Sequence, residues 1–293
     1  MRSAVFITGL CLALLGCASI QNAPVNQPGS SADLADKVRF NYDVGAEQDA
    51  DLVGLSFSGG GTRAAAFSFG VLSEMQRTPM RGASASMLDR LDFISGVSGG
   101  SVTAAYYGLR KRAALDDFRE RFLLRNAEEG LETNLTLETL GKALAGGIND
   151  SRGFPRWLDA NLFNGATFAD LHETERPRVW INASDIYNRT PFVFSATTFS
   201  AMCSDLAKYP LANAVAASAA VPVAFAPVVI QTFARECSDP LPAWIVKARD
   251  DRHGQPILSS YAKAINQAEL GRDPGGDCPP HDHPPRVLPR HPQ

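Results

Sequence analysis

Basic residues are not in excess in this sequence: 28 Lys and Arg stand against 31 Asp and Glu, which gives a formal net charge of -3 at pH 7. A protein that gathers nucleic acid through its phosphates normally carries a positive field, so we expect no nucleic-acid partner. The five cysteines form no Cys-x-x-Cys pair and have no nearby histidine at metal-ligand spacing, so we expect no metal. Beyond the N-terminus, no apolar run reaches the roughly 18 residues that a membrane-spanning helix needs.

The first residues are instead typical of a secretory signal. Arg2 precedes a short apolar run, and the Leu-Leu-Gly-Cys sequence that ends at Cys17 resembles the bacterial lipobox. In that motif the cysteine thiol receives a lipid and the chain is cleaved in front of it. We therefore expect residues 1–16 to be a lipoprotein signal peptide and Cys17 to carry a lipid anchor. A plain signal peptide with a chance cysteine and a buried N-terminal helix are the alternatives.

Residues 17–48 are expected to be the lipidated N-terminus and a flexible tether, because they are rich in Ser, Asn, Gln, Pro and Asp. By resemblance to enterobacterial lipoproteins, Ala18 in place of aspartate favours a bacterial cell-envelope location in the outer membrane, facing the periplasm. In that oxidising compartment Cys203 and Cys237 are candidates for a disulfide, with two free thiols as an equal alternative.

The far end of the chain, residues 273–293, has a different composition. It holds seven prolines and three of the five histidines (His281, His283 and His291) and has no apolar periodicity. Dense proline forms neither helix nor central strand, so we expect a Pro/His-rich disordered tail. The irregular histidine spacing does not support a metal site.

The body, residues 49–272, begins with two strand–loop–helix units. An apolar strand at 51–57 runs into glycines and then a helical pattern over 62–76, and a strand at 91–95 runs into a second glycine loop and a helix over 101–109. Two such units in succession predict an α/β fold with a largely parallel sheet covered by helices. Further strands are predicted at 178–183 and 191–195, a further helix at 211–220, and a mostly helical covering layer at 114–163.

The second glycine loop matches the nucleophile-elbow pattern Gly-x-Ser-x-Gly, with Ser98 at its centre. In that motif the serine sits in a strained turn between strand and helix, which small flanking residues allow to close. The helix N-terminus behind it presents N–H groups to developing negative charge. An ordinary glycine-rich turn with a surface serine is the alternative.

The first glycine loop, Ser58–Arg63, is an anion cradle at a helix start. No Gly-Lys-Ser/Thr follows, which excludes a P-loop, and Ala64 stands where a dinucleotide motif needs its third glycine. We therefore expect no nucleotide cofactor. An oxyanion loop that serves the serine is the interpretation that uses both loops together.

These motifs resemble a known family. Ser58–Arg63 followed by Gly96–Gly100, with Pro191-Phe192 and the Ala216–Pro222 helix end beyond, is similar to the patatin-like phospholipases over about residues 50 to 270. The resemblance implies a three-layer α/β/α fold with a mainly parallel central sheet, a Ser-Asp dyad and hydrolysis of acyl esters of lipids. It implies that Ser98 is the nucleophile and that Gly59, Gly60 and Gly61 with Arg63 form the oxyanion loop.

The base that should activate Ser98 is missing from its expected place. The family takes it from an Asp-Gly-Gly or Asp-Gly-Ala motif beyond the strand that Pro227–Ile230 represents, and the nearest match, Asp273-Pro274-Gly275-Gly276, is interrupted by proline. His172 and His253 lie in polar surroundings, so a Ser-His-Asp triad is not expected. We therefore expect a truncation or frame change near residue 272, which would leave the C-terminal part of the fold incomplete. The sequence thus favours a serine esterase of phospholipase A or lysophospholipase type, acting on membrane lipid, with a non-catalytic lipid-binding envelope lipoprotein as the alternative.

Overall fold

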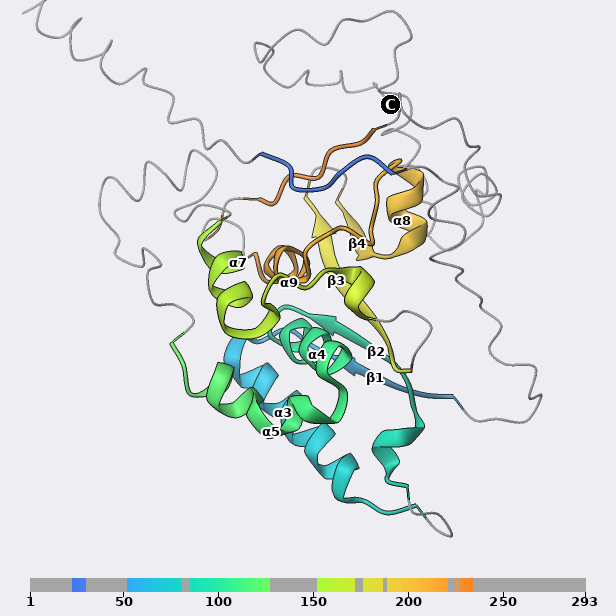
Figure 1. Ribbon diagram of the computed structural model, residues 1–293, viewed down its shortest axis with the longest axis vertical. Helices are drawn as coiled ribbons and strands as arrows, with labels where there is room; N and C mark the ends of the chain where they lie inside the picture. Colours follow the sequence, from blue (N-terminus) through green and yellow to red (C-terminus); the bar gives the residue numbers. More distant parts are fainter. Residues whose placement is uncertain are drawn as a thin grey trace, which may run out of the picture.

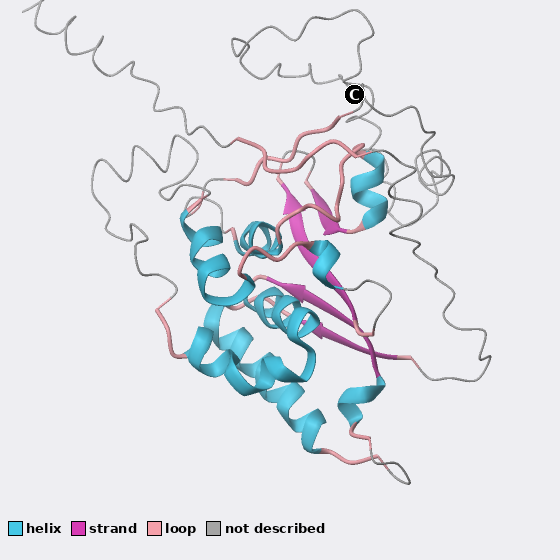
Figure 2. Ribbon diagram, viewed as in Figure 1, coloured by secondary structure: helices cyan, strands magenta, loops and turns pink. Residues whose placement is uncertain are grey.

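A computed structural model describes residues 23–29, 52–80, 85–126, 152–171, 176–186, 189–220, 225 and 227–233 of the chain. Over these ranges the strands form a single mixed sheet in the order β1-β2-β3-β4, with helices packed against it (Figures 1 and 2). The strands are β1 (Val53–Phe57), β2 (Leu91–Val97), β3 (Arg178–Asp185) and β4 (Thr190–Phe194). The first three are parallel, and β4 returns antiparallel to β3. The predicted α/β class with a mainly parallel sheet is confirmed.

Two long helices follow the first two strands and cover one face of the sheet. Helix α3 (Gly61–Arg77) buries Ala65, Ser68, Leu72 and Met75, the spacing of one helical face. Helix α4 (Gly99–Arg110) packs against α3, β2 and β3 and is buried on every side from Gly99 to Gly108. Its small residues permit this, because a Cβ added at Gly108 would lie 2.3 Å from Val179 Cγ2 of β3.

The remaining described helices are short and extend the same core. They are η1 (Met87–Arg90), η2 (Lys111–Ala113), α5 (Ala114–Phe118), η3 (Arg119–Leu123), α7 (Gly153–Leu158), η4 (Asp159–Phe163), η5 (Phe168–Leu171), α8 (Ala196–Ala201) and α9 (Leu211–Ala219). Helix α9 packs against β3, α4 and α7. The predicted helical character of 114–163 is therefore confirmed for its described parts, which are 114–126 and 152–163.

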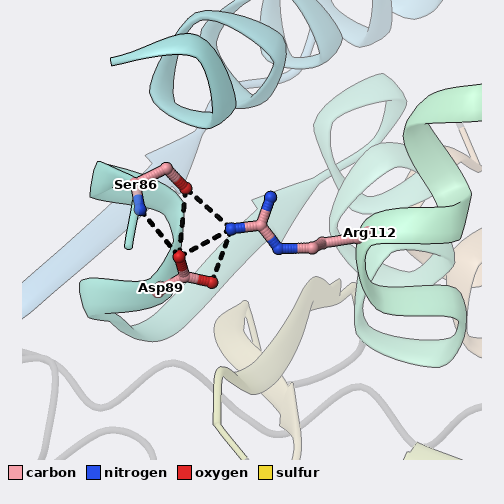
Figure 3. A network of polar contacts seen from close by, with 3 residues as sticks. All are labelled: Ser86, Asp89 and Arg112. Atoms are coloured by element: carbon pink, nitrogen blue, oxygen red, sulfur yellow. Dashed lines mark hydrogen bonds and ion pairs between the residues drawn. The ribbon is translucent and has the colours of Figure 1, made fainter. Parts of the chain in front are cut away.

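A polar network joins η1 to η2 (Figure 3). Helix η1 leads into β2, and η2 follows α4. Asp89 accepts a hydrogen bond from the Ser86 backbone N–H at 2.8 Å, and the Arg112 guanidinium donates to both carboxylate oxygens of Asp89 at 2.7 and 2.6 Å. The hydrogen bond from Arg112 is the main reason why the pKa of Asp89 lies below its ordinary value. The network joins the chain segment before β2 to the segment after α4, and so helps to fix the unit that contains Ser98.

The structure differs from expectation at the N-terminus. Residues 23–29 lie within the expected tether, yet they are docked on the body. Asn26 is buried, its amide donates to Gln231 C=O at 2.7 Å and to Ser204 Oγ at 3.0 Å, and its Oδ1 accepts from Gln231 N–H at 3.0 Å. Gln27 C=O accepts from Asp205 N–H at 3.0 Å. A short polar segment can be ordered when its polar groups find partners on the body, which composition does not reveal.

The strand expected at Pro227–Ile230 is not formed. Residues 227–233 are described without strand pairing, and Val229 is exposed. Among these residues, Gln231 is hydrogen-bonded to Asn26, and Phe233 N–H donates to Met202 C=O at 2.9 Å. The family resemblance implied this strand, but in the described part of the chain these residues lie beside the N-terminal segment instead.

Cys203, buried at 1% exposure, is disulfide-bonded. The other four cysteines, Cys237 among them, lie outside the described residues, so its pairing with Cys237 stays a prediction. His172, His253, Cys17 and the Asp273–Gly276 motif also lie outside these residues. Within the described ranges no helix is both long and apolar enough to span a membrane, and no cluster of His, Cys, Asp and Glu could hold a metal ion.

Candidate active site

The carboxyl ends of β1 and β2 lie side by side, and this brings the two glycine loops together. In the parallel register Phe57, the last residue of β1, is opposite Gly96 of β2. Each strand is followed at once by its glycine loop and then by its helix. An ideal Cβ at Gly59 would lie 3.4 Å from the Cβ of Ser98, so the first loop passes directly over the serine.

Ser98 has a backbone conformation that L-residues rarely adopt. Its φ is 52° and its ψ is -123°, and α4 begins at the next residue. The turn between strand and helix is therefore sharp and strained, as the Gly-x-Ser-x-Gly pattern predicted. The Ser98 carbonyl accepts from Ser101 N–H at 2.9 Å and from Ser101 Oγ at 2.6 Å, which ties the turn to the first turn of α4.

The flanking glycines are required by close backbone approach. A Cβ at Gly96 would lie 2.6 Å from the Cα of Ser101, and one at Gly100 would lie 2.6 Å from Phe57 O. At Gly99 the added Cβ would lie only 2.0 Å from Gly61 O. Real Cβ atoms essentially never approach this closely, so each position needs a residue without a side chain.

Two helices begin at this point. Gly60, with φ 146°, is the N-cap of α3, Ser98 is the N-cap of α4, and neither helix has an acidic residue in its first turn. The first N–H groups of a helix have no acceptor within the helix, and the helix dipole places partial positive charge there. The two N-termini therefore provide N–H donors and positive potential beside the Ser98 hydroxyl, an arrangement that can stabilise a small anion.

Among the described residues, neither Arg63 nor a basic group is hydrogen-bonded to the Ser98 hydroxyl. Arg63 is exposed in the first turn of α3, and it forms no ion pair with another described residue. Ser98 is half-buried, and its hydroxyl makes no hydrogen bond to a carboxylate or imidazole in the part of the chain that the structure describes. The glycine loop at residues 59–61 therefore lies beside Ser98, but no described carboxylate or imidazole contacts the Ser98 hydroxyl.

Two residues that sequence reasoning did not single out contact the Ser98 turn. Ser218, on the last turn of α9, accepts a hydrogen bond from Ser98 N–H at 2.8 Å and donates one to Asn182 C=O at 2.6 Å. The Asn182 side-chain amide donates to Ser95 Oγ at 2.8 Å and to Gly96 C=O at 3.1 Å. Ser218 lies in the Ala216–Pro222 segment on which the family resemblance partly rests, where it is a polar residue in an Ala-rich helix end.

Comparison with known families gives one match. A family model described as patatin-like phospholipase matches residues 55–234, which is more than half of the 293-residue chain. The matched range contains both glycine loops, Ser98 and Ser218. It ends before residues 235–270, which the sequence resemblance had included. None of the curated proteins matches this chain.

Proposed function

Because the chain belongs to the patatin-like phospholipase family, whose members are lipid acyl hydrolases, we propose that it hydrolyses acyl esters of membrane lipids with Ser98 as its nucleophile. The observation that carries the proposal is the position of Ser98 in a positive-φ turn, directly beside the glycine loop at residues 59–61. A nucleophile needs an accessible hydroxyl and a nearby set of donors for the charge that its attack creates. Ser98 is only half-buried, and the N-termini of α3 and α4 begin beside it, which supports the proposal.

In the proposed reaction the Ser98 hydroxyl attacks the ester carbonyl carbon and loses its proton to a base. The carbonyl oxygen becomes an oxyanion, and we expect the N–H groups of Gly60, Gly61 and Gly99 to stabilise it, because they begin α3 and α4 beside Ser98. The intermediate then expels the alcohol, which is a lysolipid from a diacyl substrate or the deacylated glycerophosphodiester from a lysolipid. The alcohol takes up the proton held by the base, and the acyl group stays on Ser98 Oγ. Water attacks this acyl-enzyme, which releases a fatty acid and restores the serine.

The missing contact between Ser98 and a base among the described residues favours a second candidate function, a non-catalytic lipid-binding protein with the same scaffold. Labelling with a fluorophosphonate separates the two. We expect labelling that Ser98→Ala abolishes, with Ser73→Ala as a control that retains it, because the Ser73 hydroxyl bonds to Phe69 C=O within α3. A folded chain that does not label at all contradicts the hydrolase and supports the lipid-binding alternative.

The base can be tested separately. An esterase assay compares this chain with a version extended by an Asp-Gly-containing C-terminus of the family type. If activity appears only in the extended version, this chain lacks its base. Equal activity in both shows that the base lies within the present 293 residues.

We further propose that Cys17 carries a lipid and holds the protein at the bacterial envelope, on the periplasmic face of the outer membrane. The proposal is based on the lipobox-like sequence before Cys17 and on Ala18 after it. The docked residues 23–29 limit how far the body can lie from the proposed anchor, because only six peptide units separate Cys17 from Ala23. At a maximum of about 3.6 Å per residue, the body would lie within roughly 22 Å of the anchored cysteine.

Metabolic labelling with a fatty acid and membrane fractionation test this proposal. Cys17→Ser is expected to abolish lipid incorporation and to release the protein from membranes. Cys11→Ser is the matched control, since Cys11 lies in the segment expected to be removed. Unchanged membrane association of an unlipidated Cys17→Ser protein excludes the anchor.

A further inference from the structure

The Ser98 N–H group occupies an unusual position in the backbone. It follows the last residue of β2 and precedes the first residue of α4, so neither the sheet ladder nor the helix supplies its acceptor. An N–H that loses its hydrogen bond to water and gains no acceptor in the protein destabilises the fold. The Ser218 hydroxyl is the acceptor, at 2.8 Å and 120 residues away in the sequence.

The Ser218 hydroxyl is fixed in turn by its own donated hydrogen bond. It donates to Asn182 C=O at 2.6 Å, and Asn182 is paired with Val97, the residue immediately before Ser98. The oxygen therefore bridges β3 and the strained turn, and its lone pair is directed at Ser98 N–H. A hydroxyl can donate to the carbonyl and accept from the amide through the same oxygen atom.

We propose that Ser218 is a positioning residue that holds Ser98 in its positive-φ conformation. The inference rests on the proposed function of Ser98 as the nucleophile, and it adds a specific consequence. Because the Ser98 N–H is already bonded to Ser218, it does not contribute to the oxyanion site. The donors there are the N–H groups of Gly99 and of the first glycine loop.

The test uses the full chain with three substitutions. Ser218→Ala removes the acceptor, Ser218→Thr retains it, and Ser73→Ala is the matched control. Ser73 is also a half-buried helix serine, but its hydroxyl bonds only to Phe69 C=O of its own helix at 2.8 Å. Two readouts are measured: hydrogen–deuterium exchange of the Ser98 amide by NMR, and the rate of Ser98 labelling by a fluorophosphonate.

In the wild-type chain we expect the Ser98 amide to exchange at least about tenfold more slowly than that of Gly99, which begins a helix and has no acceptor within it. In Ser218→Ala this protection should be lost and labelling should slow by about 10- to 100-fold, the equivalent of one lost hydrogen bond at a strained site. Ser218→Thr should restore both readouts, and Ser73→Ala should leave both unchanged.

The outcomes that overturn the proposal are distinct. Rapid exchange of the wild-type Ser98 amide would show that its hydrogen bond to Ser218 Oγ does not form. This measurement does not depend on whether any variant folds. Normal labelling in a Ser218→Ala protein that has lost protection shows that the contact does not position the nucleophile. If the wild-type chain does not label although its Ser98 amide is protected, the hydrolase function fails, and the positioning role fails with it.

Discussion

Substitution of Gly99 by alanine tests the contact on which the candidate site depends, the one between the Ser98 turn and the glycine loop. The added Cβ would lie 2.0 Å from Gly61 O and 2.7 Å from Gly61 C. Both are backbone atoms, so no change of rotamer relieves the overlap. Ordinary van der Waals contact begins near 3.4 Å, and an increase from 2.0 Å to 3.4 Å requires the two helix starts to separate by about 1.4 Å.

The size of the effect follows from this displacement. Forcing an extra methyl group into well-packed structure typically costs about 1–3 kcal/mol of stability. A misplacement of about 1 Å in a catalytic arrangement can reduce rates by roughly 100-fold. We therefore expect Gly99→Ala to lower the free energy of unfolding by about 1–3 kcal/mol and to slow fluorophosphonate labelling of Ser98 by about two orders of magnitude.

Urea unfolding at constant m-value measures the first effect, and the labelling rate below the unfolding transition measures the second. Gly70→Ala is the matched control, because a Cβ there meets nothing within 4 Å in the interior of α3. It should stabilise the protein by about 0.5–1 kcal/mol, the difference between alanine and glycine in a helix. If Gly99→Ala unfolds at the wild-type urea concentration and labels at the wild-type rate, the two loops are not in contact and the reasoning is refuted.

Three further predictions follow from single contacts. Ser98→Gly relieves the positive-φ strain and should raise the free energy of unfolding by about 1 kcal/mol, whereas Ser98→Ala should not; equal stability of the two variants in urea would exclude the strain. Asn26→Ala removes the partners of the Gln231 N–H and C=O groups, so it should lower the free energy of unfolding by about 1–3 kcal/mol and accelerate amide exchange at Gln231. Unchanged exchange at Gln231 would contradict this. The hydrogen bond from Arg112 lowers the pKa of Asp89, so this pair stabilises the fold above about pH 4 and the contribution is lost as the pH falls through the lowered pKa. Asp89→Asn should therefore lower the free energy of unfolding by at most about 1 kcal/mol at pH 7, because both side chains are partly exposed, and by less as the pH falls through the lowered pKa of Asp89; a pH-independent difference in urea titrations would contradict this.

The sequence determined the features that depend on neighbouring residues. The strands that begin at Val53 and Leu91 are short apolar runs that end in glycines, and the helices after them have alanine-rich, regularly spaced apolar positions. Gly-x-Ser-x-Gly between a strand and a helix indicated the strained turn at Ser98. These patterns are local, because φ/ψ preferences and hydrophobic periodicity act over a few residues, and so they could be read without coordinates.

Tertiary structure decided the contacts that join distant parts of the chain. The parallel pairing of β1 with β2 brings Gly59 to Ser98, and the packing of α9 on β3 places the Ser218 hydroxyl against the Ser98 amide. The same kind of contact docks Asn26 on the body, where composition predicted a flexible tether, while Val228–Ile230 form no strand despite their β-propensity. A hydrogen bond between residues 120 apart has no signature in the spacing of either partner, because it exists only when the fold brings donor and acceptor together.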